Sequence, residues 1–238
     1  FLVFSAQISP DGKLVAVTNR GGQEDLFVVE LATGEVRQLT NDDAHDRGAA
    51  WSPDGAHIYF YSQREADRYE IWRVAADGSG LKRITTTSGR SVWYPAVAPD
   101  GKRVSFYNDQ NTFVLADRIT PLPPAPNAFH PAMTAWSPDG TMLAGELRPG
   151  TGIWIYSFAD QTYRQITESG ARPIWLPNGR EILYSDGRLR IANIDTRAIR
   201  DVATTLPIAQ MSLSADGRTM VFSDRRVQSD IWAIALAP

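Results

Sequence analysis

The sequence contains no cysteine, which excludes disulfide bonds, thiolate metal sites and cysteine nucleophiles. It also lacks any apolar run of about 18 residues, so we expect no helix that inserts into a membrane. The formal net charge is only −3, and we expect no nucleic-acid partner, because phosphate binding needs a concentrated basic surface. With 238 residues, 43% of them hydrophobic, the chain can bury the core of one large all-β domain.

A Pro-Asp-Gly tripeptide recurs along the chain. Complete copies begin at Pro10, Pro53, Pro99 and Pro138, and degenerate copies begin at Pro177 and Ala215, with spacings of 43, 46, 39, 39 and 38 residues. Pro presets φ, Asp accepts hydrogen bonds from the following backbone, and Gly accepts the positive φ of a tight reversal. Each copy therefore predicts a hairpin turn.

Strand-like runs surround each tripeptide in a constant order. In the second repeat these runs are the segment ending at Trp51, then Ile58–Phe60, Ile71–Arg73 and the polar Lys82–Thr85. Four antiparallel strands in about 40 residues are typical of a β-propeller blade, because such a sheet buries both faces only against neighbouring copies. The repeats therefore predict a propeller.

We predict an all-β fold, a six-bladed β-propeller with four antiparallel strands per blade, in a single domain of residues 1–238. The last repeat ends without a fourth strand, whereas the first repeat is preceded by the apolar run Phe1–Phe4. We therefore predict that residues 1–4 complete the last blade and close the ring, which removes a sheet edge. The predicted blades span residues 5–42, 43–87, 88–126, 127–168, 169–205, and 206–238 with 1–4.

The repeats resemble those of the TolB-like propellers, which carry a Ser-Pro-Asp-Gly turn followed by a strand and a later apolar-aromatic strand. The resemblance rests on Ile8–Lys13, Trp51–Gly55 and Trp136–Gly140, and on the Gln-Leu-Thr and Gln-Ile-Thr strand ends. The sequence departs from the TolB-like pattern at Leu176–Gly179 and Ser214–Gly217, and the third repeat lacks a clear fourth strand. The resemblance covers all six repeats and implies architecture more than function.

Members of this broad class include partner-docking proteins of the bacterial envelope, gating domains of prolyl oligopeptidase-like enzymes, and carboxy-terminal domains of bacterial kinases and winged-helix regulators. The resemblance implies a binding or sensing module without catalytic activity or cofactor, within a larger bacterial signalling or envelope protein. We expect the chain, which begins without Met or a leader, to be a mature or excised segment, and we favour an extracytoplasmic location. Its partner would be a protein or small ligand at the loop face or central channel.

In a propeller, the loops between blades share one face with the loops between second and third strands, and ligands bind there. On this face we predict binding residues that mix arginine with aromatic side chains, as interaction hot spots do. They are Arg47, Trp93, Tyr94, His130, Arg172 and Arg225.

Each of these residues also has a structural interpretation. Trp93 and Tyr94 fall outside the repeat register and form either a ligand platform or a loop anchor. Arg47 and Arg172 could bind a carboxylate or phosphate through paired donors, although an ion pair with a loop aspartate such as Asp46 is the simpler interpretation that we favour for them.

Metal chemistry is the alternative to a binding module. His45 and His130 fall on the predicted loop face with Asp43 and Asp46, and such a set could serve a metal-assisted lyase or hydrolase. We favour no metal, because the spacing of these residues matches no local ligand motif.

Overall fold

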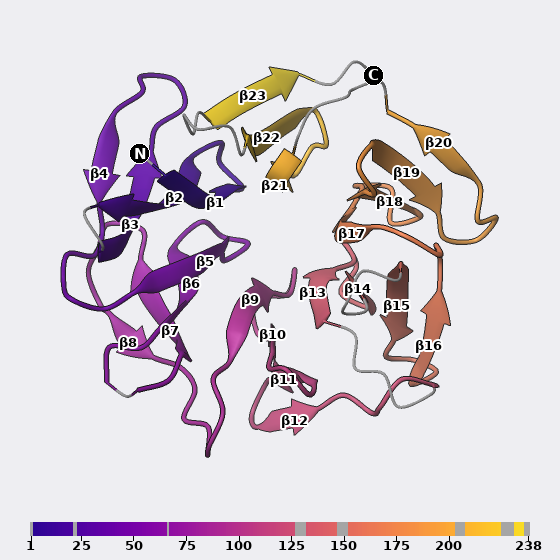
Figure 1. Cartoon of the computed structure of the whole chain (residues 1–238), viewed down its shortest axis with the longest axis horizontal. Helices are drawn as coiled ribbons and strands as arrows, with labels where there is room; N and C mark the ends of the chain where they lie inside the picture. The colour runs from indigo at the N-terminus through magenta and orange to yellow at the C-terminus, as the bar shows by residue number, and fades with distance from the viewer. Residues whose placement is uncertain are drawn as a thin grey trace. The chain divides into compact units, whose positions relative to one another are not determined.

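The structure is a computed structural model, and it describes residues 2–20, 23–65, 67–126, 132–146, 152–202, 208–224 and 231–235. These residues form six antiparallel sheets, five of four strands and one of three, as Figure 1 shows. The chain divides into two compact units, Phe1–Val97 with Ile208–Pro238, and Ala98–Pro207. The all-β prediction and the antiparallel four-stranded repeat are confirmed.

The first unit holds two complete sheets, the strand β9 and the three-stranded sheet. The strands of the two complete sheets are β1 (Leu2–Ile8), β2 (Leu14–Arg20), β3 (Gln23–Val29) and β4 (Val36–Gln38), then β5 (Asp46–Trp51), β6 (His57–Ser62), β7 (Glu70–Ala75) and β8 (Lys82–Arg83). The remaining strands are β9 (Trp93–Val97), β21 (Ile208–Leu213), β22 (Thr219–Asp224) and β23 (Ile231–Ala235).

The second unit repeats the same hairpin order. Its strands are β10 (Val104–Tyr107), β11 (Thr112–Leu115), β12 (Ile119–Pro121), β13 (Ala132–Trp136), β14 (Met142–Glu146), β15 (Ile153–Ser157), β16 (Thr162–Gln165), β17 (Ala171–Trp175), β18 (Glu181–Ser185), β19 (Leu189–Asn193) and β20 (Ile199–Asp201). The third repeat does have a fourth strand, because β12 pairs with β11.

The Ser-Pro-Asp-Gly tetrapeptides form the predicted turns. In the second repeat the Ser52 hydroxyl donates to Asp54 at 2.5 Å and accepts from the backbone N–H of His57 at 2.9 Å, while Gly55 has a φ of 69°. The Ser214 hydroxyl makes the same bond to Asp216 in the last repeat. The turn therefore depends on a side-chain oxygen and a glycine rather than on its proline.

Apolar residues from adjacent sheets make up the core of each unit. One cluster joins Leu26 and Val28 of β3 to Trp51, Phe60 and Trp72 of the second sheet. In the second unit, Ile153 and Ile155 of β15 pack with Trp175, Ile182 and Tyr184. The repeated tryptophans Trp51, Trp72 and Trp175 are buried, as a core position predicts.

A recurring contact ties the fourth strand of each sheet to the third. In five sheets, a carbonyl of the third strand accepts the backbone N–H of the apolar residue that follows the fourth strand. The pairs, with the accepting residue first, are Leu26–Leu39, Ile71–Ile84, Thr112–Leu122, Ile153–Ile166 and Leu189–Val202, all at 2.8 Å. In three sheets the residue after the apolar one is a buried threonine whose hydroxyl accepts the N–H of the same third-strand residue. These pairs are Leu26–Thr40, Ile71–Thr85 and Ile153–Thr167, at 3.0, 2.9 and 2.9 Å. We call this the apolar-Thr clamp, and it explains the Gln-Leu-Thr and Gln-Ile-Thr motifs.

The predicted closure by residues 1–4 is wrong. Leu2 and Val3 pair with Asn19 and Thr18 of β2, so this segment belongs to the first strand of the first sheet. Leu2–Phe4 are part of β1, which runs on to Ile8 and is longer than predicted. Among the described residues, the sheet of β21, β22 and β23 has three strands, and β23 pairs only with β22.

Candidate functional site

Irregular first strands set the geometry of the candidate site. The register of β5 on β6 shifts between Arg47 and Ala50, and that of β17 on β18 shifts between Ala171 and Ile174. Further shifts interrupt β1, β13 and β21. Such β-bulges bend a strand and re-aim its side chains, often beside functional sites.

Three residues at one position of the repeat have left-handed backbone. Gly48, Tyr94 and Arg172 each lie three residues before the end of a first strand, and their φ values are 62°, 53° and 57°. Glycine adopts this conformation freely, whereas a tyrosine or arginine held there costs on the order of 1 kcal/mol. The two strained residues are Tyr94 and Arg172, both of which the sequence analysis selected.

The absence of a side chain at Gly48 makes room for Tyr61 of β6. A Cβ atom at Gly48 would lie 2.4 Å from Cε1 of the Tyr61 ring. Tyr61 is buried, and its ring meets that of Tyr94 edge to face, with centroids 5.6 Å apart. The Tyr69 ring also meets the Tyr61 ring edge to face, with centroids 5.2 Å apart. Together with Arg47, whose guanidinium lies 5.6 Å from the Tyr69 ring, we call these residues the tyrosine cluster.

Surface exposure differs across the tyrosine cluster. Tyr61 is 8% exposed, Tyr69 is half-buried and Tyr94 is 37% exposed. Burial raises the pKa of Tyr61, and burial also raises that of Tyr69, so both phenols stay protonated at neutral pH. The cluster thus presents one exposed aromatic ring supported by a buried one.

A buried carboxylate holds Arg47. The Arg47 guanidinium donates through Nε to Oε2 of Glu24 and through Nη2 to Oε1 at 2.8 Å, and the Glu24 side chain is only 5% exposed. This pairing raises the pKa of Arg47 further above its usual range. His45 lies beside the same carboxylate, with Nδ1 3.6 Å from Oε2. Arg47 thus forms an ion pair, as the simpler interpretation predicts, but its partner is Glu24 of β3 and not the loop residue Asp46 that was given as an example.

Asp46 belongs to a separate buried group. Arg64 donates to both oxygens of Asp46, at 2.7 and 2.6 Å, and to Asp42 at 2.5 Å. Burial raises the pKa of Asp46 despite the guanidinium, and burial together with the charge of Asp46 raises the pKa of Asp25. Thr40 donates to Asp25 at 3.4 Å, so the chain's first clamp adjoins this group.

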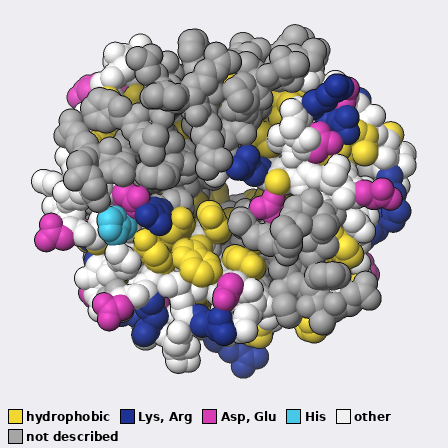
Figure 2. Space-filling model, viewed as in Figure 1, with side chains coloured by type: hydrophobic (Ala, Val, Ile, Leu, Met, Phe, Trp, Pro, Cys, Tyr) yellow, Lys and Arg dark blue, Asp and Glu magenta, His cyan; other side chains and the backbone are white. Residues whose placement is uncertain are grey.

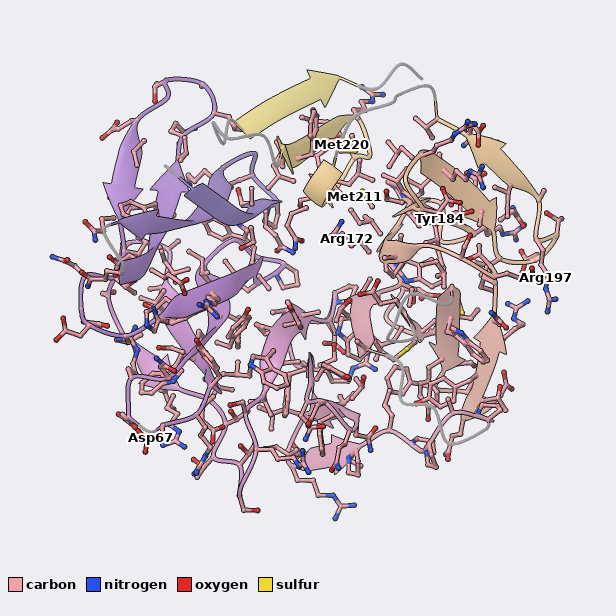
Figure 3. The ribbon with its side chains drawn as sticks, in the orientation of Figure 1. Asp67, Arg172, Tyr184, Arg197, Met211 and Met220 are labelled. Carbon is pink, nitrogen blue, oxygen red and sulfur yellow. The ribbon has the colours of Figure 1, made fainter. Side chains whose placement is uncertain are left out.

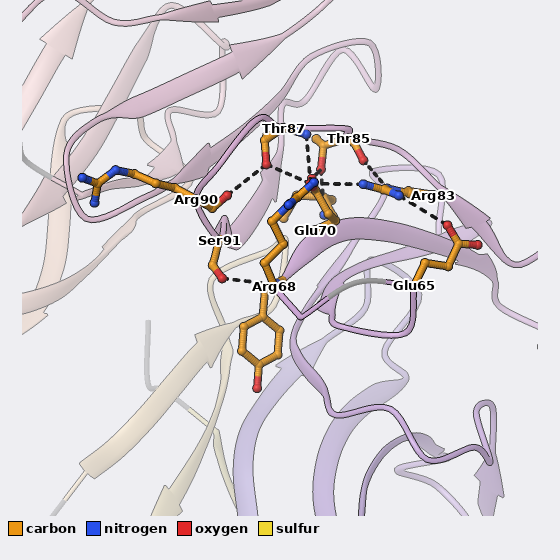
Figure 4. A network of polar contacts seen from close by, with 10 residues as sticks. Glu65, Arg68, Glu70, Arg83, Thr85, Thr87, Arg90 and Ser91 are labelled. Carbon is orange, nitrogen blue, oxygen red and sulfur yellow. Dashed lines mark hydrogen bonds and ion pairs between the residues drawn. The ribbon is translucent and has the colours of Figure 1, made fainter.

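Figure 4 shows the corresponding network around Glu70 of β7. Glu70 is 2% exposed and accepts hydrogen bonds from Thr85 and Thr87, with Arg83 at 3.2 Å. The same loop continues to Ser91, whose hydroxyl accepts the N–H of Tyr69 at 3.1 Å. The network therefore anchors the segment that leads into β9 and Tyr94.

In the second unit, Arg172 is the second residue of β17 and lies close to a tightly packed glycine. Its backbone N–H donates to Glu146 at 3.2 Å. Two residues earlier, Gly170 has a φ of 108°, and a Cβ there would lie 2.4 Å from the ring of Tyr184, the β18 residue labelled with Arg172 in Figure 3. Tyr184 thus fills the space beside Gly170 as Tyr61 fills that beside Gly48.

The structure brings Arg47 and Tyr94 of the predicted set together, and half-buried Trp93 precedes Tyr94 at the start of β9. Arg172 lies in the second unit and shares only the repeat position of Tyr94. His130 and Arg225 lie outside the described residues. Within the described part of the chain, no three His, Asp or Glu side chains gather as a metal site.

Sequence reasoning missed Tyr61, Tyr69 and Glu24. Tyr61 and Glu24 lie within strands, where their types look like ordinary strand residues, and Glu24 reaches Arg47 across 23 positions of sequence. The one available signal was Gly48, a glycine inside a strand, which often marks a bulge or a close approach of another group.

Comparison with known proteins adds the family. A family model of the TolB beta propeller domain matches residues 2–120, half of the chain. The chain belongs to this family. Among relatives of this TolB-family chain, an uncharacterized protein of Agrobacterium fabrum is 37% identical over 99 residues, which are 41% of this chain and 33% of that protein. The Tol-Pal system protein TolB of Anaeromyxobacter dehalogenans is 30% identical over 86 residues, 36% of this chain and 19% of that protein.

The solved structures support the same fold. The crystal structure of TolB from Acinetobacter baumannii superposes with a TM-score of 0.77 at 17% identity, covering 95% of this chain and 62% of that one. The matched segments span a third or less of the two curated relatives. The TolB-like propeller resemblance is therefore confirmed for the fold.

The surface of this TolB-family chain mixes charges of both signs. Figure 2 shows acidic and basic side chains interspersed over the face that it draws. No helix among the described residues is long and apolar enough to cross a membrane.

Proposed function

We propose that the chain is a non-catalytic protein-binding module and that the tyrosine cluster is part of its binding surface. The observation that supports this most directly is Tyr94, an exposed aromatic residue in left-handed backbone at the start of β9. Strained residues persist only where the surrounding structure imposes them, and they concentrate at functional sites. Tyrosine and arginine are also the residues that contribute most at protein interfaces.

The geometry favours a preorganised contact. Tyr94 rests on Tyr61, which fills the space left by Gly48, and Arg47 is oriented by Glu24 before any partner arrives. A side chain already fixed in its binding geometry loses less conformational entropy on association. Arg172, at the same repeat position, is proposed as a second contact on its own unit.

The remaining expectations belong to this proposal. The six sheets would be the blades of one closed propeller and one domain, within a larger bacterial signalling or envelope protein. Trp93, His130 and Arg225, which the sequence analysis selected, are also proposed as contacts of the binding surface. The similarity of the fold to TolB supports a protein partner.

Affinity capture from a bacterial lysate tests the proposal when variants are compared. Tyr94→Ala removes the exposed ring, and Val36→Ala, the control, removes an apolar side chain of β4 that is even more exposed, at 60% against 37%. We expect a protein that is retained by wild type and Val36→Ala and lost with Tyr94→Ala, with a Kd at least about tenfold weaker on titration, or about 1.4 kcal/mol. Unchanged capture by Tyr94→Ala and by Arg47→Ala would contradict the proposal.

A further inference from the structure

A proline-rich segment ends the third repeat, in the second unit of the chain. Residues 121–126 read Pro-Leu-Pro-Pro-Ala-Pro and begin at the last residue of β12, the edge strand of its sheet. We call them the proline segment. Leu122–Ala125 form no helix or strand, as the trace that follows β12 in Figure 1 shows. Proline fixes its own φ and restrains the preceding residue, so this sequence favours the extended polyproline II conformation.

Burial along this part of the chain repeats every three residues. Leu122 and Ala125 are buried, at 6% and 4% exposed, and Ile119 is half-buried. The residues between and around them are exposed, namely Arg118, Thr120, Pro121, Pro123, Pro124 and Pro126. A polyproline II helix has three residues per turn, so residues three apart share a face. One face of the segment is therefore buried against the protein, and two faces are open to solvent.

Two hydrogen bonds hold the proline segment in place. The backbone N–H of Leu122 donates to the carbonyl of Thr112 at 2.8 Å, and the hydroxyl of Tyr163 donates to the carbonyl of Pro123 at 2.7 Å. Burial raises the pKa of Tyr163, so its hydroxyl stays protonated and remains a donor. A ligand segment that is fixed before binding loses less conformational entropy when a partner binds it.

A positive charge precedes the exposed prolines. Arg118 lies three residues before Pro121, and Pro124 lies three residues after it. The Arg118 side chain is exposed, and within the described part of the chain it makes no hydrogen bond or ion pair. A partner that reads Pro121 and Pro124 can therefore also read a charge at one end of them, through an acidic residue of its own.

We propose that Arg118–Pro126 is a preformed polyproline II ligand for a partner protein whose groove is lined by aromatic side chains and carries an acidic residue at one end. Aromatic-lined grooves bind such segments because the ligand is already extended and rigid. Leu122 and Ala125 face the chain itself, which leaves the exposed prolines to contact the groove. The segment shares no residue with the tyrosine cluster, so this proposal can fail while the one around Tyr94 holds.

A panel of SH3, WW and EVH1 domains is the probe, because these domains bind polyproline II segments in aromatic-lined grooves. Each domain is titrated with the full chain by calorimetry. We expect at least one domain to bind with a Kd below about 1 mM, and the double variant Pro121→Ala/Pro124→Ala to bind it at least about tenfold more weakly. Pro177→Ala is the matched control, because Pro177 is also exposed and the sixth repeat carries Ala215 at that position.

The charge is tested in the same assay. Arg118→Glu should weaken binding at least about threefold, and added salt should reduce this difference. Arg180→Glu changes another exposed arginine of the second unit and should leave binding unchanged. Equal effects of the two substitutions would show that Arg118 makes no specific contact.

A peptide copy of residues 117–126, Asp-Arg-Ile-Thr-Pro-Leu-Pro-Pro-Ala-Pro, tests the faces without any dependence on folding. The peptide should bind the same domain, and Pro124→Ala in the peptide should weaken binding as in the chain. Leu122→Ser in the peptide should leave binding unchanged, because Leu122 belongs to the face turned away from the partner. Equal losses from these two changes would refute the assignment of faces.

Three results would overturn the proposal as a whole. The first is that no domain of the panel binds the chain. The second is that the peptide binds and the full chain does not, because the proline segment would then be covered in the folded protein. The third is self-association of the chain that Pro124→Ala abolishes, because the segment would then serve a second copy of the chain.

Discussion

Tyr94 and Arg172 have the same left-handed backbone at the same position of their first strands, with φ values of 53° and 57°. Gly48 fills this position in β5 with a φ of 62°, and glycine is the residue that adopts this conformation without strain. At the other two positions the chain carries large side chains and the associated backbone cost. The strain therefore coincides with two residues for which we propose a binding role.

Replacing Arg172 separates this backbone cost from the side chain. We expect Arg172→Gly to be more stable than Arg172→Ala by about 1 kcal/mol, because only glycine relieves the left-handed φ. Urea unfolding of both variants measures the difference. At Arg200 in the extended strand β20, the order should reverse, with glycine less stable than alanine. The same order at both positions would refute the strain argument.

The space beside Gly48 gives a second prediction. Gly48→Ala should destabilise by more than about 2 kcal/mol, because its Cβ would lie 2.4 Å from the Tyr61 ring in addition to the backbone strain. Gly55→Ala is the matched control, since Gly55 has a φ of 69° and a Cβ added there would meet no atom within 4 Å, and it should cost only about 1 kcal/mol. Thermal unfolding distinguishes the two. Similar losses would mean that the ring moves away freely.

The contributions of two apolar-Thr clamps to stability can be compared in the same way. Thr85→Val should cost about 2–3 kcal/mol, because it leaves both the Ile71 N–H and the Glu70 carboxylate short of a partner. Thr167→Val removes the partner of the Ile153 N–H and a bond to the Ser169 carbonyl, with no carboxylate involved, and should cost about 1 kcal/mol. Chemical denaturation of the two variants tests this order, and a larger loss at Thr167 would contradict it.

Two aspartates, Asp11 and Asp25, should give opposite dependences of stability on pH. Lys13 and the Ser9 hydroxyl hold the pKa of Asp11 at about 2, below the 3.8 of an unperturbed carboxyl. Its contribution to stability is present above pH 3.8 and is lost as the pH falls toward 2. The pKa of Asp25 is raised, mainly by burial, so its contribution is present below pH 3.8 and is lost as the pH rises through its own pKa.

Asparagine substitutions test these signs through urea unfolding between about pH 3 and pH 8. Relative to wild type, Asp25→Asn should gain stability progressively as the pH rises, because the variant carries no charge to bury. Asp11→Asn should be less stable than wild type above pH 3.8, and this difference in stability should shrink at the acid end of the range. A difference between Asp25→Asn and wild type that does not change with pH would show that the Asp25 carboxyl is not protonated more readily in the folded state.

The sequence predicted the elements that repeat and missed those that occur once. The Ser52-Asp54 turn and the buried Trp51 recur in form, so periodicity alone located them. The Glu24–Arg47 pair joins two different sheets, and nothing in the local pattern of β3 distinguishes Glu24 from a solvent-facing residue. Phe1–Phe4 was misassigned because an apolar run indicates a strand without indicating which neighbour it pairs with.

The turn between first and second strands shows how far a repeat can drift while its shape persists. In the fifth copy Asn178 replaces the aspartate, and its Oδ1 still accepts the N–H groups of Arg180 and Glu181. In the sixth copy Ala215 replaces the proline, yet Ser214 and Asp216 keep their bond. All six copies keep one side-chain acceptor oxygen and the glycine that follows it, so a library that randomises the other two turn positions should retain folding in most of its members.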